Sequence, residues 1–212
     1  MARYGFKISP ERKPKVNPDR DKWNERYRQS TALPGAARVL IENKHLLPPS
    51  GLALDLACGL GGNALLLAEL GFQVEAWDIS DVAVKRLQQE SRKQKLPVKA
   101  QVRNLTMGAL PDDHFDIIVV SRFLERGLAP CIIKALRPGG VLFYQTFIRA
   151  RVGEAGPESP IFRLKENELL HLFDGLTVLA YREEGLVGDL KRGFRDEAQL
   201  VARKNDSNLT EE

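Results

Sequence analysis

A glycine-rich turn between two apolar segments constrains the fold of this 212-residue chain more than any other feature. Residues 54–78 read LDLACGLGGNALLLAELGFQVEAWD, so the turn that contains Gly59, Gly61 and Gly62 leads into a helix-forming stretch and then into a segment ending in Asp78. This order predicts strand, turn, helix and strand, which places a nucleotide-like ligand at the carboxyl edge of a parallel sheet. The glycines allow a sharp turn and let a ligand approach the backbone without a Cβ in the way.

Two acidic residues flank the turn and distinguish between two classes of nucleoside cofactor. The turn matches the loose dinucleotide pattern G-x-G-x-x-G/A, but Asp55, four residues before Gly59, would then face a pyrophosphate that is already negative. The same carboxylate favours a ligand that carries a positive sulfonium and an ammonium group. Asp78, at the end of the second predicted strand, is placed to accept hydrogen bonds from ribose hydroxyls. These residues favour S-adenosylmethionine over a dinucleotide.

The motifs along residues 36–204 resemble those of the class I S-adenosylmethionine-dependent methyltransferases. After D-L-A-C-G-x-G and the acid-terminated strand come Asn104-Leu105 at the end of a third strand, FDIIVV at 115–120 and LRPGGVL at 136–142. Within that family, WNERY at 23–27, NALLLAELG after the turn and SRFLER after the fourth strand are most similar to the tellurite-resistance and thiopurine-type branch. The resemblance implies an α/β, doubly wound, Rossmann-like fold whose seven-stranded sheet is mostly parallel and ends in an antiparallel hairpin.

The resemblance also implies an activity, the transfer of a methyl group from S-adenosyl-L-methionine to a small-molecule acceptor, with a thiol or a chalcogen oxyanion as candidates. A non-catalytic S-adenosylmethionine-binding regulator and a methyltransferase of RNA or protein stay open as alternatives. A nicotinamide oxidoreductase is disfavoured by Asp55 and by the terminal hairpin. No catalytic residue is assigned, because methyl transfer mainly requires that the reactants be aligned and shielded from water.

The expected site residues follow the ends of the predicted strands. The expected cofactor-binding residues are Asp55, Ala57, Gly59, Gly61, Asp78, Ile79, Asn104, Leu105 and Ser121. The family usually has Gly in place of Ala57 and often has Asp in place of Asn104. Asn104 can still accept a hydrogen bond from an adenine amino group, but it carries no charge.

Three further residues are expected on the substrate side of the site. Arg122 follows the fourth strand, beside the point where the strand order reverses, and is expected either to hold an anionic or polarisable substrate or to be an exposed surface arginine. Trp23 and Tyr27 lie four residues apart on one face of a predicted helix over 19–29. They are expected either to fold over the cofactor as a lid or to pack as a hydrophobic staple.

Charge and composition set the expected class and location of the protein. Residues 1–28 hold nine basic and four acidic residues, a net charge of +5 against +4 for the whole chain, so the basic character belongs to the leading segment. A basic arm of this kind keeps nucleic acid or an acidic partner as an alternative to a solvated tail. The sequence shows no apolar run long enough to span a bilayer, no signal-peptide core and no cysteine pattern for disulfides or metal, which predicts a cytoplasmic protein without a metal site.

Periodicity and capping signals predict the elements and domain limits. The expected units are a basic segment with a possible lid helix over 1–30, the methyltransferase domain over 31–205 and a C-terminal tail over 206–212. Ser80 is expected to cap its helix. His45, His114 and His171 are expected at the surface or in the core rather than in catalysis. The predicted helices cover 33–47, 63–70, 80–94, 128–136 and 165–173, and the predicted strands cover 52–56, 73–78, 98–102, 115–120, 141–147, 177–182 and 197–203.

Overall fold

The centre of the fold is a seven-stranded sheet with the strand order β3-β2-β1-β4-β5-β7-β6. The computed structural model describes residues 17–105 and 110–206. The strands are β1 (Leu52–Leu56), β2 (Gln73–Asp78), β3 (Val98–Val102), β4 (Phe115–Ser121), β5 (Leu136–Phe147), β6 (Thr177–Arg182) and β7 (Glu197–Arg203). Strands β1 to β5 pair in parallel, whereas β7 runs antiparallel to both β5 and β6. The predicted fold class, including the terminal antiparallel hairpin, is confirmed.

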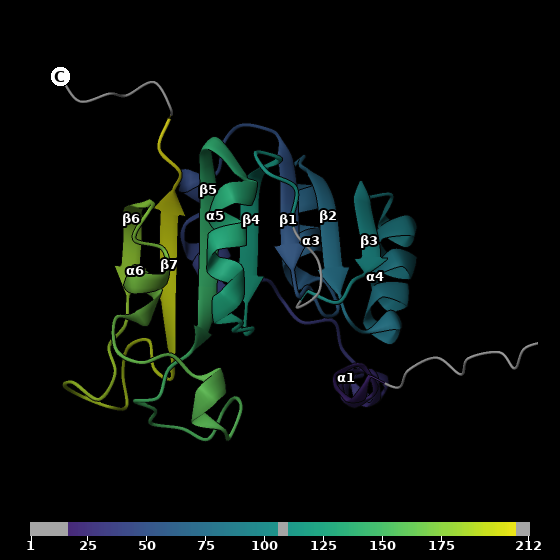
Figure 1. Cartoon of the computed structure of the whole chain (residues 1–212). Helices are drawn as coiled ribbons and strands as arrows, with labels where there is room; N and C mark the ends of the chain where they lie inside the picture. The colour runs from purple at the N-terminus through teal and green to yellow at the C-terminus, as the bar shows by residue number, and fades with distance from the viewer. Residues whose placement is uncertain (1–16, 106–109, 207–212) are drawn as a thin grey trace, which may run out of the picture.

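Helices cover both faces of the sheet and bury two hydrophobic clusters against it. The helices of the described chain are α1 (Pro18–Gln29), α2 (Arg38–Glu42), α3 (Gly62–Glu69), α4 (Asp81–Gln94), α5 (Ala129–Ala135) and α6 (Glu168–Leu172), with short 3-10 turns at Lys44–Leu46, Arg126–Leu128 and Pro160–Phe162. Side chains of α2, α3 and α4 pack on one face, and those of α5 and α6 pack on the other. In Figure 1, α5 and α6 lie in front of the sheet, and α1 lies beyond the edge at which β1 and β2 end.

The direction of β7 brings its first residue to the edge at which the parallel strands end. The antiparallel register pairs Glu197, which begins β7, with Phe147, which ends β5. The carboxyl ends of β1, β2, β4 and β5 therefore meet the amino end of β7 at one edge. Ligands of open α/β sheets bind at this edge.

Several predicted element limits are wrong for local reasons. The predicted helix over 33–47 is reduced to α2 and one 3-10 turn, because Pro34 and Gly35 disfavour helix and the Ala37 N–H donates to the side chain of Asn63, 2.8 Å away. The helix predicted over 165–173 begins only at Glu168, after Asn167 adopts a φ of 59°. The helix predicted over 128–136 ends at Ala135 because Leu136 is already extended and enters β5.

Some expectations fall outside the described residues. The segment before Pro18 is expected to be mobile, but residues 1–16 lie outside the described chain, as do residues 207–212 of the predicted tail. Within the described ranges, no helix is long and apolar enough to cross a membrane.

The three histidines lie at the surface or near it. His45 and His171 are exposed, whereas His114 is half-buried with its ring edge-on to Phe115.

Candidate cofactor and acceptor site

The glycine turn after β1 depends on left-handed backbone conformations. Gly59 and Gly61 have φ values of 52° and 85°, and α3 begins directly after Gly61. Ala57 also lies in the left-handed region, with a φ of 57°. Such a conformation costs a residue with a Cβ about 1–2 kcal/mol. Ala57 therefore carries a backbone cost that the Gly usual at this position in the family avoids.

The Asp55 carboxylate lies entirely buried at the end of β1. It accepts hydrogen bonds from the backbone N–H of Ala64 at 3.0 Å and from Asn63 Nδ2 at 3.3 Å. Burial, with a smaller contribution from the nearby Asp78, raises the pKa of Asp55 to about 7, although the two hydrogen bonds oppose this shift. A cation placed beside this carboxylate would offset the cost of burying its charge.

The Asp78 carboxylate joins the glycine turn to the start of α4. Its two oxygens accept hydrogen bonds from the backbone N–H groups of Gly59 and Ser80, each at 2.8 Å. Burial raises the pKa of Asp78, which is only 5% exposed. An ionised carboxylate has about four acceptor positions, so both oxygens keep capacity for ribose hydroxyls.

Helix α1 places an aromatic side chain directly over the glycine turn. A Cβ on Gly59 would lie 2.7 Å from Tyr27 Oη, and the Tyr27 ring stacks on Trp23 with a centroid distance of 5.7 Å. The pKa of Tyr27 is raised, first by burial and then by the nearby Asp78. Tyr27 therefore lies at the predicted cofactor turn, with Trp23 stacked behind it.

Polar residues that sequence reasoning missed attach α1 to α4. Asn24 is buried; its Nδ2 donates to Asp81 Oδ1 at 2.7 Å, and its Oδ1 accepts from Ser80 Oγ at 2.6 Å. Arg86 Nη1 donates to the backbone carbonyl of Tyr27 at 2.7 Å. Ser80 caps α4 as predicted, through the Ala83 N–H. The polar Asn24 within WNERY is a sequence signal for such a contact, whereas no local pattern points to Arg86.

A second polar network lies beyond β4, on the other side of the turn. Asn63 Nδ2 donates to Ser121 Oγ at 3.0 Å as well as to Asp55, which links the predicted residue Ser121 to the turn. Arg122 has a φ of 54°, and its Nε donates to Glu197 Oε1 at 2.9 Å. Neither Asn63 nor Glu197 was predicted as a site residue. Glu197 is distant in sequence from the other site residues and belongs to no motif.

The predicted cofactor residues that follow β2 and β3 lie in different surroundings. Ile79 is half-buried next to Asp78, and the Arg103 N–H at the end of β3 donates to the Asp78 carbonyl at 2.8 Å, which brings the segment leading to Asn104 to this edge. Leu105 is 8% exposed and packs in the hydrophobic cluster on the α5 face.

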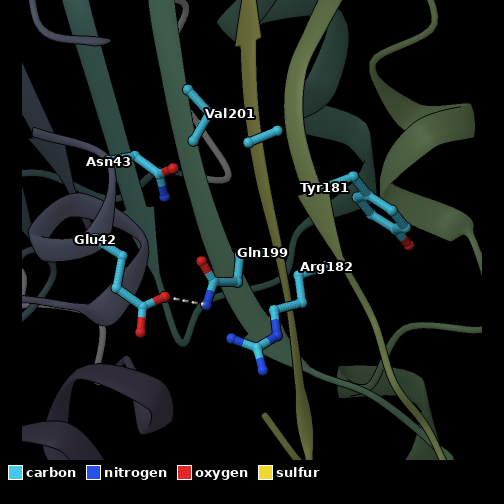
Figure 2. A pocket seen from close by; sticks show the side chains of 7 residues that line it. Glu42, Asn43, Tyr181, Arg182, Gln199 and Val201 are labelled. Carbon is cyan, nitrogen blue, oxygen red and sulfur yellow. Dashed lines mark hydrogen bonds between the residues drawn. The ribbon is translucent and has the colours of Figure 1, made fainter. Parts of the chain in front are cut away.

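A separate hollow of about 210 Å³ lies between α2 and the β6–β7 hairpin. Figure 2 shows Glu42 and Gln199 hydrogen-bonded in it, with Arg182 beside them, while Tyr181 points away. None of the predicted site residues lines this hollow.

The strand order, the terminal hairpin and the acidic glycine turn together define the class I methyltransferase fold. The family model for the tellurite resistance protein TehB matches residues 19–202, and the chain belongs to this family. The family membership predicted from the sequence is thereby confirmed.

Individual relatives with similar sequences carry different descriptions. A protein of Haemophilus influenzae described as a probable S-adenosyl-L-methionine-dependent methyltransferase TehB is 26% identical over 177 residues, which cover 81% of this chain and 59% of that protein. Hemagglutinin 1 of Eikenella corrodens is 35% identical over 138 residues, which cover 61% of this chain and 45% of that protein. The chain thus spans about half the length of the curated relatives it matches. The crystal structure of TehB from H. influenzae shares the fold, with a TM-score of 0.65 at 24% identity, covering 88% of this chain and 67% of that chain.

Proposed function

We propose that this chain is an S-adenosyl-L-methionine-dependent methyltransferase that acts on a small-molecule acceptor, with a thiol or a chalcogen oxyanion as the candidate nucleophile. The observation that carries the proposal is the pair of buried carboxylates, Asp55 and Asp78, on either side of the Gly59 turn. Their burial favours a ligand that brings positive charge to Asp55 and hydroxyl donors to Asp78. Membership of the TehB family supports the same cofactor.

Different residues of the chain would bind the cofactor and shield it from water. Asp55, Asp78 and the turn at Gly59 would hold the cofactor, which supplies the activated methyl group when bound. Residues 18–29 would act as a lid, since Tyr27 already covers Gly59. Exclusion of water and alignment of the reactants are the main contributions that a protein makes to such a transfer. A cytoplasmic location and the unit limits 1–30, 31–205 and 206–212 are part of the same proposal.

Ligand-dependent stabilisation tests the proposed cofactor. S-adenosylhomocysteine should raise the melting temperature, because a ligand that binds only the native state stabilises it by about 2.7 kcal/mol at a hundredfold excess over Kd. NAD and NADP should leave the melting temperature unchanged. Stabilisation by a nicotinamide cofactor, with no response to S-adenosylhomocysteine, would reject the proposal.

A regulator that binds the cofactor without turnover is the second candidate. Asn104 favours it, because the family often has a charged Asp at this position and the amide carries no charge. Single-turnover assays with excess protein and radiolabelled S-adenosylmethionine separate the two candidates. Methyl transfer to a small thiol supports the enzyme, and tight binding without transfer to any thiol or selenite supports the regulator.

A further inference from the structure

The backbone at the end of β4 holds Arg122 in an uncommon conformation. Its φ of 54° lies in the left-handed region, and its N–H donates to the backbone carbonyl of Gln145 on β5 at 2.8 Å. Residues in such conformations persist only where the surrounding structure imposes them, and they are concentrated at functional sites. The turn directs the Arg122 side chain toward the amino end of β7, where it meets Glu197.

The Glu197 carboxylate is fixed from two sides. Its side chain is only 10% exposed; one oxygen accepts from Arg122 Nε at 2.9 Å, and the other accepts from the Gln145 side-chain amide. Gln145 is held in turn, because its Oε1 accepts from the backbone N–H of Val39 at 2.8 Å. A buried carboxylate with this many donors is well compensated, so it can act as a rigid support for the guanidinium.

The outer end of the Arg122 guanidinium is available to a ligand. The side chain is 65% exposed, and its Nη1 and Nη2 atoms make no hydrogen bond within the described part of the chain. A guanidinium presents its donors in a planar fork that matches the oxygens of a carboxylate or another oxyanion. Because Glu197 binds Nε, this fork is held in place before any ligand arrives.

The position of Arg122 suits an acceptor rather than the cofactor. Its neighbour Ser121 is hydrogen-bonded to Asn63, which also contacts Asp55 in the cofactor turn. Arg122 therefore lies one residue beyond the hydrogen bonds that join Ser121, Asn63 and Asp55, on the side toward β5 and β7.

We propose that Arg122 binds an anionic group of the methyl acceptor, and that Glu197 is the positioning residue that orients its guanidinium. The inference rests on the proposed function and specifies its substrate class: acceptors that carry a carboxylate or another oxyanion next to the nucleophile. Neutral acceptors of the same size bind more weakly.

Two thiols of equal length test this inference by binding rather than by turnover. The protein is saturated with S-adenosylhomocysteine, and the affinities of 3-mercaptopropionate and 3-mercaptopropan-1-ol are measured by ligand-observed NMR. The wild type should prefer the carboxylate by about tenfold or more, as expected for a charge-assisted contact. Arg122→Gln should abolish the preference, and Arg122→Lys should keep part of it.

The role of Glu197 is read from the same ratio of affinities. Glu197→Ala should remove the preference, whereas Glu197→Gln, whose amide oxygen can still accept from Nε, should retain part of it. Since both thiols are measured on each variant, a general loss of folded protein does not change the ratio. Arg137→Gln is the matched control: Arg137 pairs with Asp116 at 2.7 Å at the opposite edge of the sheet, so its loss should leave the preference unchanged.

The outcomes separate the two proposals. If S-adenosylhomocysteine does not bind the wild type, the proposed function is rejected. If it binds but the wild type shows no preference for the carboxylate, or if Arg122→Gln keeps the preference, the role of Arg122 is rejected while the cofactor assignment stands.

Discussion

Tyr27 lies directly over Gly59, so close that a Cβ on the glycine would be 2.7 Å from the tyrosine hydroxyl. The contact joins residues 32 positions apart in the sequence, and it covers the turn that the sequence predicts as the cofactor site. Because Asn24 and Arg86 fix the helix that carries Tyr27 to α4, the contact is set by several hydrogen bonds and not by one aromatic ring. Opening of α1 is therefore the step that would admit a ligand.

Replacing Tyr27 with Ala should speed both the binding and the release of S-adenosylhomocysteine. An aromatic contact contributes about 0.5–1.5 kcal/mol beyond its buried area, which corresponds to about a two- to tenfold change in rate. Stopped-flow fluorescence measures both rates. Glu25→Ala is the control, because Glu25 lies on the exposed side of the same helix and contacts Arg28 and Gln29. Unchanged rates in Tyr27→Ala would show that the ring is a packing staple.

Replacing Asp78 with Ala should weaken S-adenosylhomocysteine binding strongly. The loss of a charged acceptor for ribose hydroxyls costs about 1.5–3 kcal/mol, or about 10- to 150-fold in Kd. The structure adds a second effect, because the N–H groups of Gly59 and Ser80 lose their acceptor and the free energy of unfolding should fall by about 1–3 kcal/mol. Titration calorimetry and urea unfolding measure the two effects. A folded variant with unchanged affinity would remove Asp78 from the cofactor site.

The contribution of Asp55 to the stability of the unliganded protein should fall as the pH rises from about 4 to 7. The pKa of Asp55 is raised by burial from 3.8 to about 7, so in this window the native state binds more protons than the unfolded state. The contribution of Asp55 to the free energy of unfolding then decreases with rising pH and levels off above pH 7. Asp78, whose pKa is also raised by burial, contributes in the same direction.

Asp55→Asn isolates the contribution of Asp55 to this pH dependence. The amide does not titrate, so the variant lacks the loss of stability that Asp55 causes between pH 4 and 7. The free energy of unfolding of the variant, relative to that of the wild type, should therefore increase across this range. Urea unfolding at a series of pH values measures it. A difference that does not vary with pH would mean that Asp55 titrates normally.

Replacing Ala57 with Gly should stabilise the protein. Relief of the left-handed conformation contributes about 1–2 kcal/mol, and the greater flexibility of the unfolded glycine variant offsets about 0.5–1 kcal/mol of this. The net gain of up to about 1.5 kcal/mol would appear as a higher midpoint in urea. Ala53→Gly is the control, since Ala53 lies within β1 and should lose stability on the same change.

Much of the fold was predictable because its signals are local. The limits of β1, β2, β3, β6 and β7 agree with the predicted strands, since each apolar segment is bounded by turn or capping residues. The helix over 33–47 was not predictable from periodicity, because the Ala37 N–H is used by Asn63, 26 residues away. Local propensity is a weak prior where a tertiary hydrogen bond competes with it.

The sequence by itself determined the turn at which the cofactor is proposed to bind. Asp55, Gly59, Gly61 and Asp78 belong to one continuous strand–turn–helix–strand unit, whose geometry follows from spacing and from the conformations that glycine permits. Only the tertiary structure decided what surrounds that unit. Tyr27 covers the turn because α1 is fixed to α4, and Glu197 reaches Arg122 because β7 runs antiparallel beside β5. Such pairings depend on strand order and direction, which place residues 75 positions apart within hydrogen-bonding distance.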